Sequence, residues 1–198
     1  QIPPEVARAK GGEAAANAMR FAPDLAESHC ARAFQLLMFE WDWAGGERAF
    51  KRSMELNPGY AQAGAWYHLF YEGLVCGAWD DALAGMKAYQ SRDQLSGYLT
   101  ACVAITYAIG FSEPSAEVWV DRASALDPDA FLTLWTRQLF LMSIRDWPRA
   151  IEAGRTALAS SGWHSILLHE LGLSLMESGD TAGGRAVYDE MRSRSVRE

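Results

Sequence analysis

The chain has 198 residues, of which 49% are hydrophobic, and a formal net charge of −7. The apolar content excludes an intrinsically disordered chain, and the negative charge makes nucleic acid and anionic membrane surfaces unfavourable partners. No window approaches the roughly 18 uninterrupted apolar residues of a membrane-spanning helix, so we expect no membrane insertion.

The three cysteines are expected to be reduced thiols in the core. Cys30, Cys76 and Cys102 each lie in an apolar helical stretch, and no CxxC spacing suggests zinc or redox chemistry. This usage predicts a reducing compartment such as the cytoplasm. The first residues include no initiator Met and lack the charged and then apolar pattern of an intact signal peptide, which suggests a piece of a longer protein.

A short sequence motif recurs about every 35 residues, each time where a helical pattern ends. Phe21-Ala22-Pro23, Leu56-Asn57-Pro58 and Leu126-Asp127-Pro128 each place a proline two residues after a leucine or phenylalanine. The second proline follows the first by 35 residues, and the third follows the second by twice that distance. A period of this length indicates stacked supersecondary units that share a continuous core.

Two helical patterns separated by a turn make up each unit. The second helix is expected to begin at an acid or hydroxyl residue, whose side chain can accept a free N–H of the first turn. These residues are Asp42, Asp80, Ser112, Asp146 and Asp180, with Pro114 and Pro148 near the first helical positions. Gly45-Gly46 and Gly183-Gly184 are expected where helices pack closely. Strand patterns are absent from the sequence, so we predict helix-on-helix packing throughout.

Several segments resemble the tetratricopeptide repeat, an antiparallel helix pair of about 34 residues. The residues that carry the resemblance are Leu171-Gly172, Leu175, Gly179-Asp180 and Tyr188; Trp66, Leu69, Gly77 and Ala82; and Phe50, Ser53, Leu56 and Pro58. The resemblance implies an all-α, right-handed α-α superhelix that runs as one array through residues 1–198. Its repeats would span about 27–60, 63–96, 97–130, 131–162 and 165–196, after a partial repeat at 5–22.

The sequence departs from the family pattern at three positions. Gln94 and Gly162 stand where the terminal proline is expected, which predicts a different bend at those two junctions. Arg137 stands where the family buries a leucine. Either the register is locally different there, or the arginine reaches a partner.

A narrower resemblance concerns the first repeat. The run from Phe39 to Glu47, followed by Leu56-Asn57-Pro58, is similar to the repeats attached to bacterial adenylate cyclases, serine/threonine kinases and transcriptional regulators. This similarity implies that the chain is the sensory or regulatory part of a longer bacterial signalling protein.

In the tetratricopeptide family the first helices line a concave groove that holds a partner peptide. The inward positions carried over to this chain are Ala31, Gln35, Met38, Phe39, Tyr67, Tyr71, Leu74, Ala101, Ile105, Ala108, Trp135, Leu139, Met142, His169, Leu173 and Met176. This apolar and aromatic set favours an amphipathic helix or an extended apolar peptide as partner. It lacks the lysines, arginines and asparagines with which family members grip chaperone tails. Two alternatives are that these side chains pack within the core and that a second copy of the chain fills the groove.

The histidines do not form a catalytic or metal-binding pattern. His164 and His169 are five residues apart, which places them about 140° from each other on a helix. His169-Glu170 lacks the second histidine of a HExxH site, and we assign no orienting acid or cysteine to His29 or His68. Nucleophile motifs and phosphate-binding loops are absent from the sequence. We therefore predict no catalytic residue, metal site or cofactor.

The sequence thus predicts a protein-interaction scaffold and not an enzyme. Val196-Arg197-Glu198 end the sequence without a polar capping helix. An uncapped last repeat exposes apolar surface, so we expect either a homodimer through a terminal repeat or a natural chain that continues.

Overall fold

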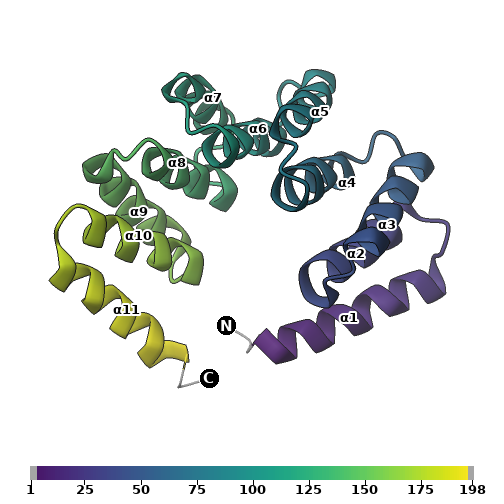
Figure 1. Ribbon diagram of the computed structural model, residues 1–198, viewed down its shortest axis with the longest axis horizontal. Coiled ribbons are helices and arrows are strands. Elements are labelled where there is room, and N and C mark those ends of the chain that lie inside the picture. Colours follow the sequence, from purple (N-terminus) through teal and green to yellow (C-terminus); the bar gives the residue numbers. More distant parts are fainter. Residues whose placement is uncertain (1–3, 196–198) are drawn as a thin grey trace. The chain divides into compact units, whose positions relative to one another are not determined.

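The computed structural model describes residues 4–195, and the chain divides after Arg92 into two compact units (Figure 1). Every regular element among the described residues is a helix, which confirms the all-α fold. Val196, Arg197 and Glu198 lie outside the described residues.

Unit 1 contains five α-helices and two π-helical segments in the described residues. They are α1 (Pro4–Phe21), α2 (Ala26–Gln35), η1 (Leu36–Glu40), α3 (Trp43–Leu56), α4 (Ala61–Trp66), η2 (Tyr67–Val75) and α5 (Trp79–Arg92). Helix α2 packs against α1, α3 and α4, while η2 packs against α3 and α5. Each helix therefore contacts its neighbours in the chain, and α2 and α4 meet across one intervening helix.

Unit 2 repeats this arrangement with six α-helices and one short 3₁₀-helix in the part that the structure describes. They are α6 (Gly97–Gly110), η3 (Pro114–Ala116), α7 (Glu117–Leu126), α8 (Phe131–Ser143), α9 (Trp147–Ser161), α10 (Ser165–Glu177) and α11 (Thr181–Ser195). Helix α8 packs against α6, α7, α9 and α10, and α10 packs against α9 and α11. The same antiparallel pairing thus continues through the unit.

The recurring Leu/Phe-x-Pro motif marks helix ends, as the sequence predicts. Helices α1, α3 and α7 end at its leucine or phenylalanine. Asn57 and Asp127, which precede prolines, lie outside the helical region with φ of −143° and −150°. The ring of a following proline disfavours helical backbone at the residue before it, which accounts for the stops.

Three of the five predicted helix starts are confirmed. Side-chain oxygens of Asp42 and Asp180 each accept a hydrogen bond of 2.8 Å from the backbone N–H three residues on, and Asp146 accepts one of 3.3 Å. The predictions for the other two are wrong. Asp80 already lies in the first turn of α5, and Ser112 occupies a turn with a φ of 53°. The α5 start gains only the favourable charge of its acids near the helix N-terminus.

Close contacts between helices occur at small residues. A Cβ atom on Gly64 of α4 would lie 2.1 Å from the Tyr89 ring of α5, and one on Gly184 of α11 would lie 2.8 Å from the carbonyl oxygen of Gly172. No side chain fits at such distances. The predicted role of Gly183-Gly184 at a close contact is therefore confirmed for Gly184.

Each unit has its own apolar core. The core of unit 1 includes Cys30, Ala33, Leu37, Phe50, Ala63 and Tyr67, and that of unit 2 includes Ala104, Ala108, Ala116, Val120, Phe140, Leu141 and Ala150. Cys30 and Cys102 are buried, and burial raises the pKa of both thiols to about 12. Cys76 is exposed, so the prediction of three core thiols is wrong for this residue. It lies beyond the last residue of η2, where the chain turns toward α5.

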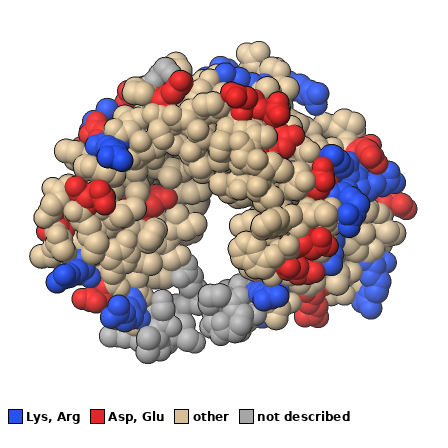
Figure 2. Space-filling view, in the orientation of Figure 1, with Lys and Arg blue, Asp and Glu red and all other residues tan. Residues whose placement is uncertain are grey.

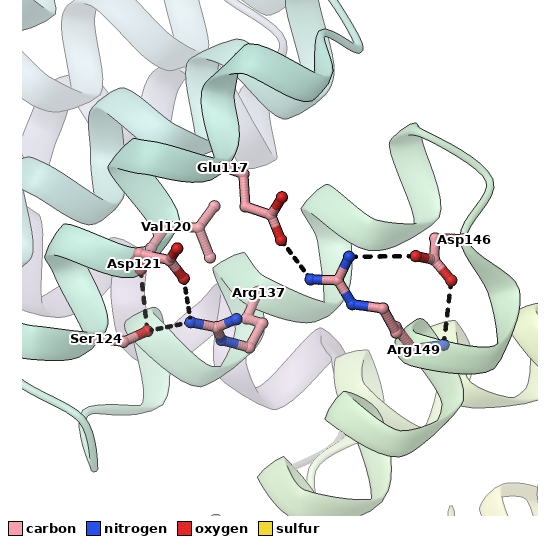
Figure 3. A network of polar contacts seen from close by, with 7 residues as sticks. All are labelled: Glu117, Val120, Asp121, Ser124, Arg137, Asp146 and Arg149. Atoms are coloured by element: carbon pink, nitrogen blue, oxygen red, sulfur yellow. Dashed lines mark hydrogen bonds and ion pairs between the residues drawn. The ribbon is translucent and has the colours of Figure 1, made fainter.

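Arg137 joins α8 to α7 (Figure 3). Its guanidinium donates to Asp121 Oδ1 at 2.9 Å and to Ser124 Oγ at 3.1 Å. The next residue, Gln138, is fully buried and donates from Nε2 to the carbonyl oxygen of Leu167 at 3.4 Å. The arginine at the family's leucine position is therefore held within unit 2 by an ion pair.

A second arginine joins α9 to α7 in the same region (Figure 3). Arg149 forms an ion pair with Glu117 and a weaker one, at 3.3 Å, with Asp146. Both arginines are partly exposed, and exposed pairs of this kind each contribute only about 0–1 kcal/mol to stability. The ion pairs of Arg137 and Arg149 therefore contribute little to stability, and their main effect is on how α8 and α9 are oriented against α7.

None of the helices between residues 4 and 195 combines the length and apolar character needed to cross a bilayer.

Replacing Gly184 by alanine tests the close contact between α10 and α11. The added methyl group meets backbone atoms that cannot rotate away, so we expect the free energy of unfolding to fall by about 1–3 kcal/mol. This loss should appear even though alanine favours an isolated helix over glycine by about 1 kcal/mol. Urea unfolding followed by circular dichroism measures it.

Gly59→Ala is the matched control, because a Cβ atom there has no neighbour closer than 3.4 Å. We expect its stability to stay within about 0.5 kcal/mol of the unchanged protein. A Gly184→Ala protein as stable as the control would show that α11 does not need this contact.

Candidate functional site

A groove in unit 1 has a mostly apolar lining that includes several predicted site residues. It has a volume of about 430 Å³ and lies between α1, α2 and α4. Its lining, which we call the α2 groove, consists of Gly11, Ala14, Ala15, Glu27, Cys30, Ala31, Phe34, Gln35, Phe39, Tyr60, Gln62 and Trp66. Ala31, Gln35 and Phe39 are among the positions predicted from the sequence.

Aromatic rings in edge-to-face and tilted contact form one wall of the α2 groove. The ring centroid of Phe34 lies 4.5 Å from that of Trp66, 5.7 Å from that of Phe70 and 6.3 Å from that of Phe39. Phe34 and Phe39 are five residues apart and would diverge on an α-helix. In the π-helical segment η1 each amide bonds five residues back, so side chains at this spacing share a face.

Polar side chains complete the lining of the α2 groove. Glu27 is exposed in the first turn of α2. The Tyr60 hydroxyl donates to Gln62 Oε1 at 3.1 Å, which leaves the Gln62 amide nitrogen as a donor. Gln35 is only 5% exposed and lies against Gly11 and Gly12 of α1. The groove therefore offers apolar contact area together with groups that can bind peptide N–H and C=O groups.

The other predicted residues of unit 1 do not join the α2 groove. Tyr67 is buried in the core, and its ring stacks on that of Tyr71 with centroids 5.5 Å apart. Burial and the neighbouring Glu47 raise the pKa of Tyr71. Met38 and Leu74 are 40% and 51% exposed and lie at a second, separate cavity.

Ile105, predicted as a groove residue in unit 2, is only 1% exposed. Ala101 and Ala108, from the same helix, are buried as well. Helix α6 packs against both α7 and α8, so its inward face forms core and offers no surface to a partner. The alternative that these side chains pack within the core holds for this helix.

The predicted positions on α8 and α10 are more accessible. Trp135, Leu139 and Met142 are half-buried on α8, and Met176 is half-buried on α10. His169 is exposed, and the Tyr188 hydroxyl donates to its backbone carbonyl oxygen at 3.2 Å. Trp135 is held in place because its indole N–H donates to Glu170 Oε1 at 2.7 Å.

His68 has an acidic partner that the sequence reasoning missed. Its Nδ1 lies 2.6 Å from Oε2 of Glu72, four residues further on. The assignment of no orienting acid to His68 is therefore wrong, and the i, i+4 spacing was the signal that could have revealed it. Among the side chains that the structure describes, no group of three or more from His, Cys, Asp and Glu is placed to hold a metal ion.

Glu170 is a buried acid, 8% exposed, whose role the sequence did not predict. Burial raises its pKa to about 7, and the hydrogen bond from Trp135 opposes this shift only in part. Its Oε2 has no hydrogen-bond partner among the described residues. Trp135 and Glu170 are 35 residues apart, which is the repeat period, so equivalent first helices bring them together.

The raised pKa of Glu170 predicts a pH-dependent stability. The folded chain keeps a proton that the unfolded chain releases between about pH 4.5 and pH 7, so the contribution of Glu170 to the free energy of unfolding falls across this interval. Glu170→Gln removes this dependence while keeping an oxygen for Trp135. We expect the variant to match the unchanged protein near pH 4.5 and to exceed its stability by about 3 kcal/mol at pH 8.

Urea unfolding at the two pH values measures this difference. Glu177→Gln on the exposed face of the same helix serves as control and should follow the unchanged protein at both pH values. Equal pH dependence in Glu170→Gln and the unchanged protein would contradict a proton held at Glu170.

Solved structures similar to this chain show its fold. A chain in the crystal structure of the APC/C hetero-tetramer Cut9–Hcn1 matches 92% of this chain with a TM-score of 0.71 and 14% sequence identity. The match spans 36% of that chain, so this protein covers about a third of its length. The MamA protein matches with a TM-score of 0.53 and 16% identity over 82% of this chain and 90% of its own.

YrrB, described as a TPR protein with an unusual peptide-binding site, matches with a TM-score of 0.50 and 14% identity over 89% of each chain. No protein-family model and no curated protein sequence matches the chain. At these identities the structural similarity establishes the fold alone: the chain has the fold of the tetratricopeptide-repeat proteins.

Proposed function

We propose that the chain is a protein-interaction scaffold that binds a partner peptide in the α2 groove. The observation that carries this proposal is the wall of contacting aromatic rings, Phe34, Phe39 and Trp66, beside polar groups on Tyr60 and Gln62. Buried aromatic anchors supply most of the binding energy at protein interfaces, and polar groups beside them hold the peptide backbone. The role is one of binding and not of catalysis.

The partner peptide carries a large apolar side chain flanked by neutral or basic residues. Glu27 places a negative charge on the groove lining, and the chain as a whole has a net charge of −7, so acidic peptides are repelled. On the face that Figure 2 shows, acidic and basic side chains are intermixed. Recognition of the peptide therefore depends on the aromatic groove more than on a charged patch.

The exposed and half-buried positions of unit 2 form a second contact surface in this proposal. They are Trp135, Leu139, Met142, His169 and Met176. The assembly of Cut9 with Hcn1 and the peptide-binding site named for YrrB show that proteins of this fold bind polypeptides, which supports the proposal by analogy.

The narrower sequence resemblance supports a second function, that of a regulatory domain in a bacterial cyclase, kinase or transcriptional regulator. Under this proposal the unpaired thiols Cys30 and Cys102 fit a reducing compartment, the cytoplasm. The complete open reading frame tests it, because it should encode a catalytic or DNA-binding region beside these repeats. Self-association through the terminal repeats is a third alternative, which sedimentation over a range of protein concentrations tests.

Ala31→Arg tests peptide binding in the α2 groove. Ala31 is an exposed residue of the lining, so an arginine there obstructs the groove without disturbing the core. Peptides selected from a phage-displayed library of 12-residue sequences, and made with a fluorescent label, should bind the unchanged protein saturably. We expect the variant to bind them at least about tenfold more weakly, equivalent to about 1.4 kcal/mol.

Ala88→Arg, at an exposed position of α5 outside the groove, is the matched control and should retain the full affinity in fluorescence anisotropy titrations. Trp135→Ala is less suitable as a test variant, because it would also leave the Glu170 carboxyl without its indole donor. Equal affinities of the two arginine variants would reject the α2 groove as the peptide site.

A further inference from the structure

A second cavity in unit 1, of about 250 Å³, is lined by apolar and aromatic side chains. Leu37, Met38, Trp41 and Trp43 come from η1 and the start of α3, and Phe70, Leu74 and Val75 come from η2. We call it the Trp41 pocket. Its side chains carry no charge, and the only polar groups on them are the two indole N–H groups.

The backbone at Trp41 is held in a conformation that turns its ring outward. Trp41 follows the last residue of η1 and has a φ of 57°, in the left-handed region that large side chains rarely adopt. The N–H of Asp42 bonds back to the carbonyl oxygen of Leu36 at 3.1 Å, and the Asp42 side chain then caps α3. Arg145 adopts the same left-handed conformation before α9, with a φ of 60°, so this turn recurs in the fold.

The rim of the Trp41 pocket exposes much apolar surface. Trp41 is 72% exposed, Leu74 51%, Trp43 49% and Met38 40%. Together they present on the order of 400–500 Å² of apolar area to solvent, a size that marks interaction sites on soluble proteins. The two π-helical segments supply most of the lining, and such segments recur at functional sites.

Three kinds of occupant can be compared for the Trp41 pocket: a peptide segment, a second copy of the chain and a small uncharged aromatic molecule. A peptide segment would bring amide groups into a pocket without an acceptor side chain, and burying an unpaired amide costs about 1–3 kcal/mol. A second copy of the chain would bury only about half of the 800 Å² per partner that a standard interface needs. A small uncharged aromatic molecule brings at most one N–H group, fewer polar groups than a peptide segment, and needs no large interface. The α2 groove already offers the polar groups that suit a peptide.

We propose that the Trp41 pocket binds a small, uncharged aromatic molecule of about the size of indole. A cavity of about 150 Å³ lined by apolar side chains accommodates benzene, so a volume of about 250 Å³ accommodates a fused two-ring molecule. The rings of Trp41, Trp43 and Phe70 provide aromatic walls for it. Charged molecules are excluded because nothing in the lining replaces their hydration.

Titration with 5-fluoroindole, followed by ¹⁹F NMR, tests the proposal on the full chain. A fragment of this size is expected to bind with a Kd of about 0.1–1 mM, since its few atoms limit the attainable free energy. Zwitterionic 5-fluorotryptophan carries the same ring with two charges and should bind at least about tenfold more weakly.

Trp41→Gly removes one wall of the pocket and also relieves the positive φ, so the variant is expected to fold. It should weaken 5-fluoroindole binding at least about tenfold, as should Leu74→Asp at an exposed position of the opposite wall. Arg145→Gly is the matched control, because Arg145 is an exposed residue with a φ of 60° outside the pocket. Binding to this control and to Ala31→Arg should equal that of the unchanged protein.

Three outcomes would overturn the proposal. Unchanged 5-fluoroindole affinity in both Trp41→Gly and Leu74→Asp would place the ligand elsewhere, and loss of binding in Ala31→Arg alone would place it in the α2 groove. A dimer that forms with increasing concentration in sedimentation experiments and is abolished by Trp41→Gly would make the patch an interface between copies. Peptide binding in the α2 groove could fail without affecting any of these results.

Discussion

The close approach of neighbouring helices at small residues is the constraint on which both units depend. Gly64 receives the face of the Tyr89 ring, and Gly184 meets the backbone of α10 at a distance that no side chain could share. In an interior packed this tightly, a larger side chain would force the neighbouring helices apart. The contact at Gly64 sets how closely α4 approaches α5, and α4 forms one side of the α2 groove.

Much of the fold follows from regularities that act locally. The Leu/Phe-x-Pro motif ends helices because proline restricts the backbone of the residue before it. Helices begin after Asp42, Asp146 and Asp180 because each carboxylate accepts a hydrogen bond from a free backbone N–H group. These effects need only neighbouring residues, so the sequence reveals them. The start at Ser112 was mispredicted because the chain there turns through a left-handed residue and a 3₁₀ segment before α7.

The candidate sites were less predictable, since they depend on how helices are wound and not only on where they lie. The family pattern assumes regular α-helices, whereas η1 and η2 shift the phase of the residues that follow. Phe39 consequently reaches the α2 groove, whereas Met38 and Leu74 line a separate pocket. Ile105 shows a different limit: a position that faces a groove in one repeat becomes core where α6 is covered on both sides.

Phe70 lines the Trp41 pocket and contacts two aromatic residues that line the α2 groove. Its ring lies 5.7 Å from Phe34 and 6.3 Å from Trp66 in the wall of that groove. A molecule that reorients the Phe70 ring in the proposed pocket would also displace the neighbouring rings of Phe34 and Trp66. Under the two proposals above, ring contacts of this kind would couple the two sites reciprocally.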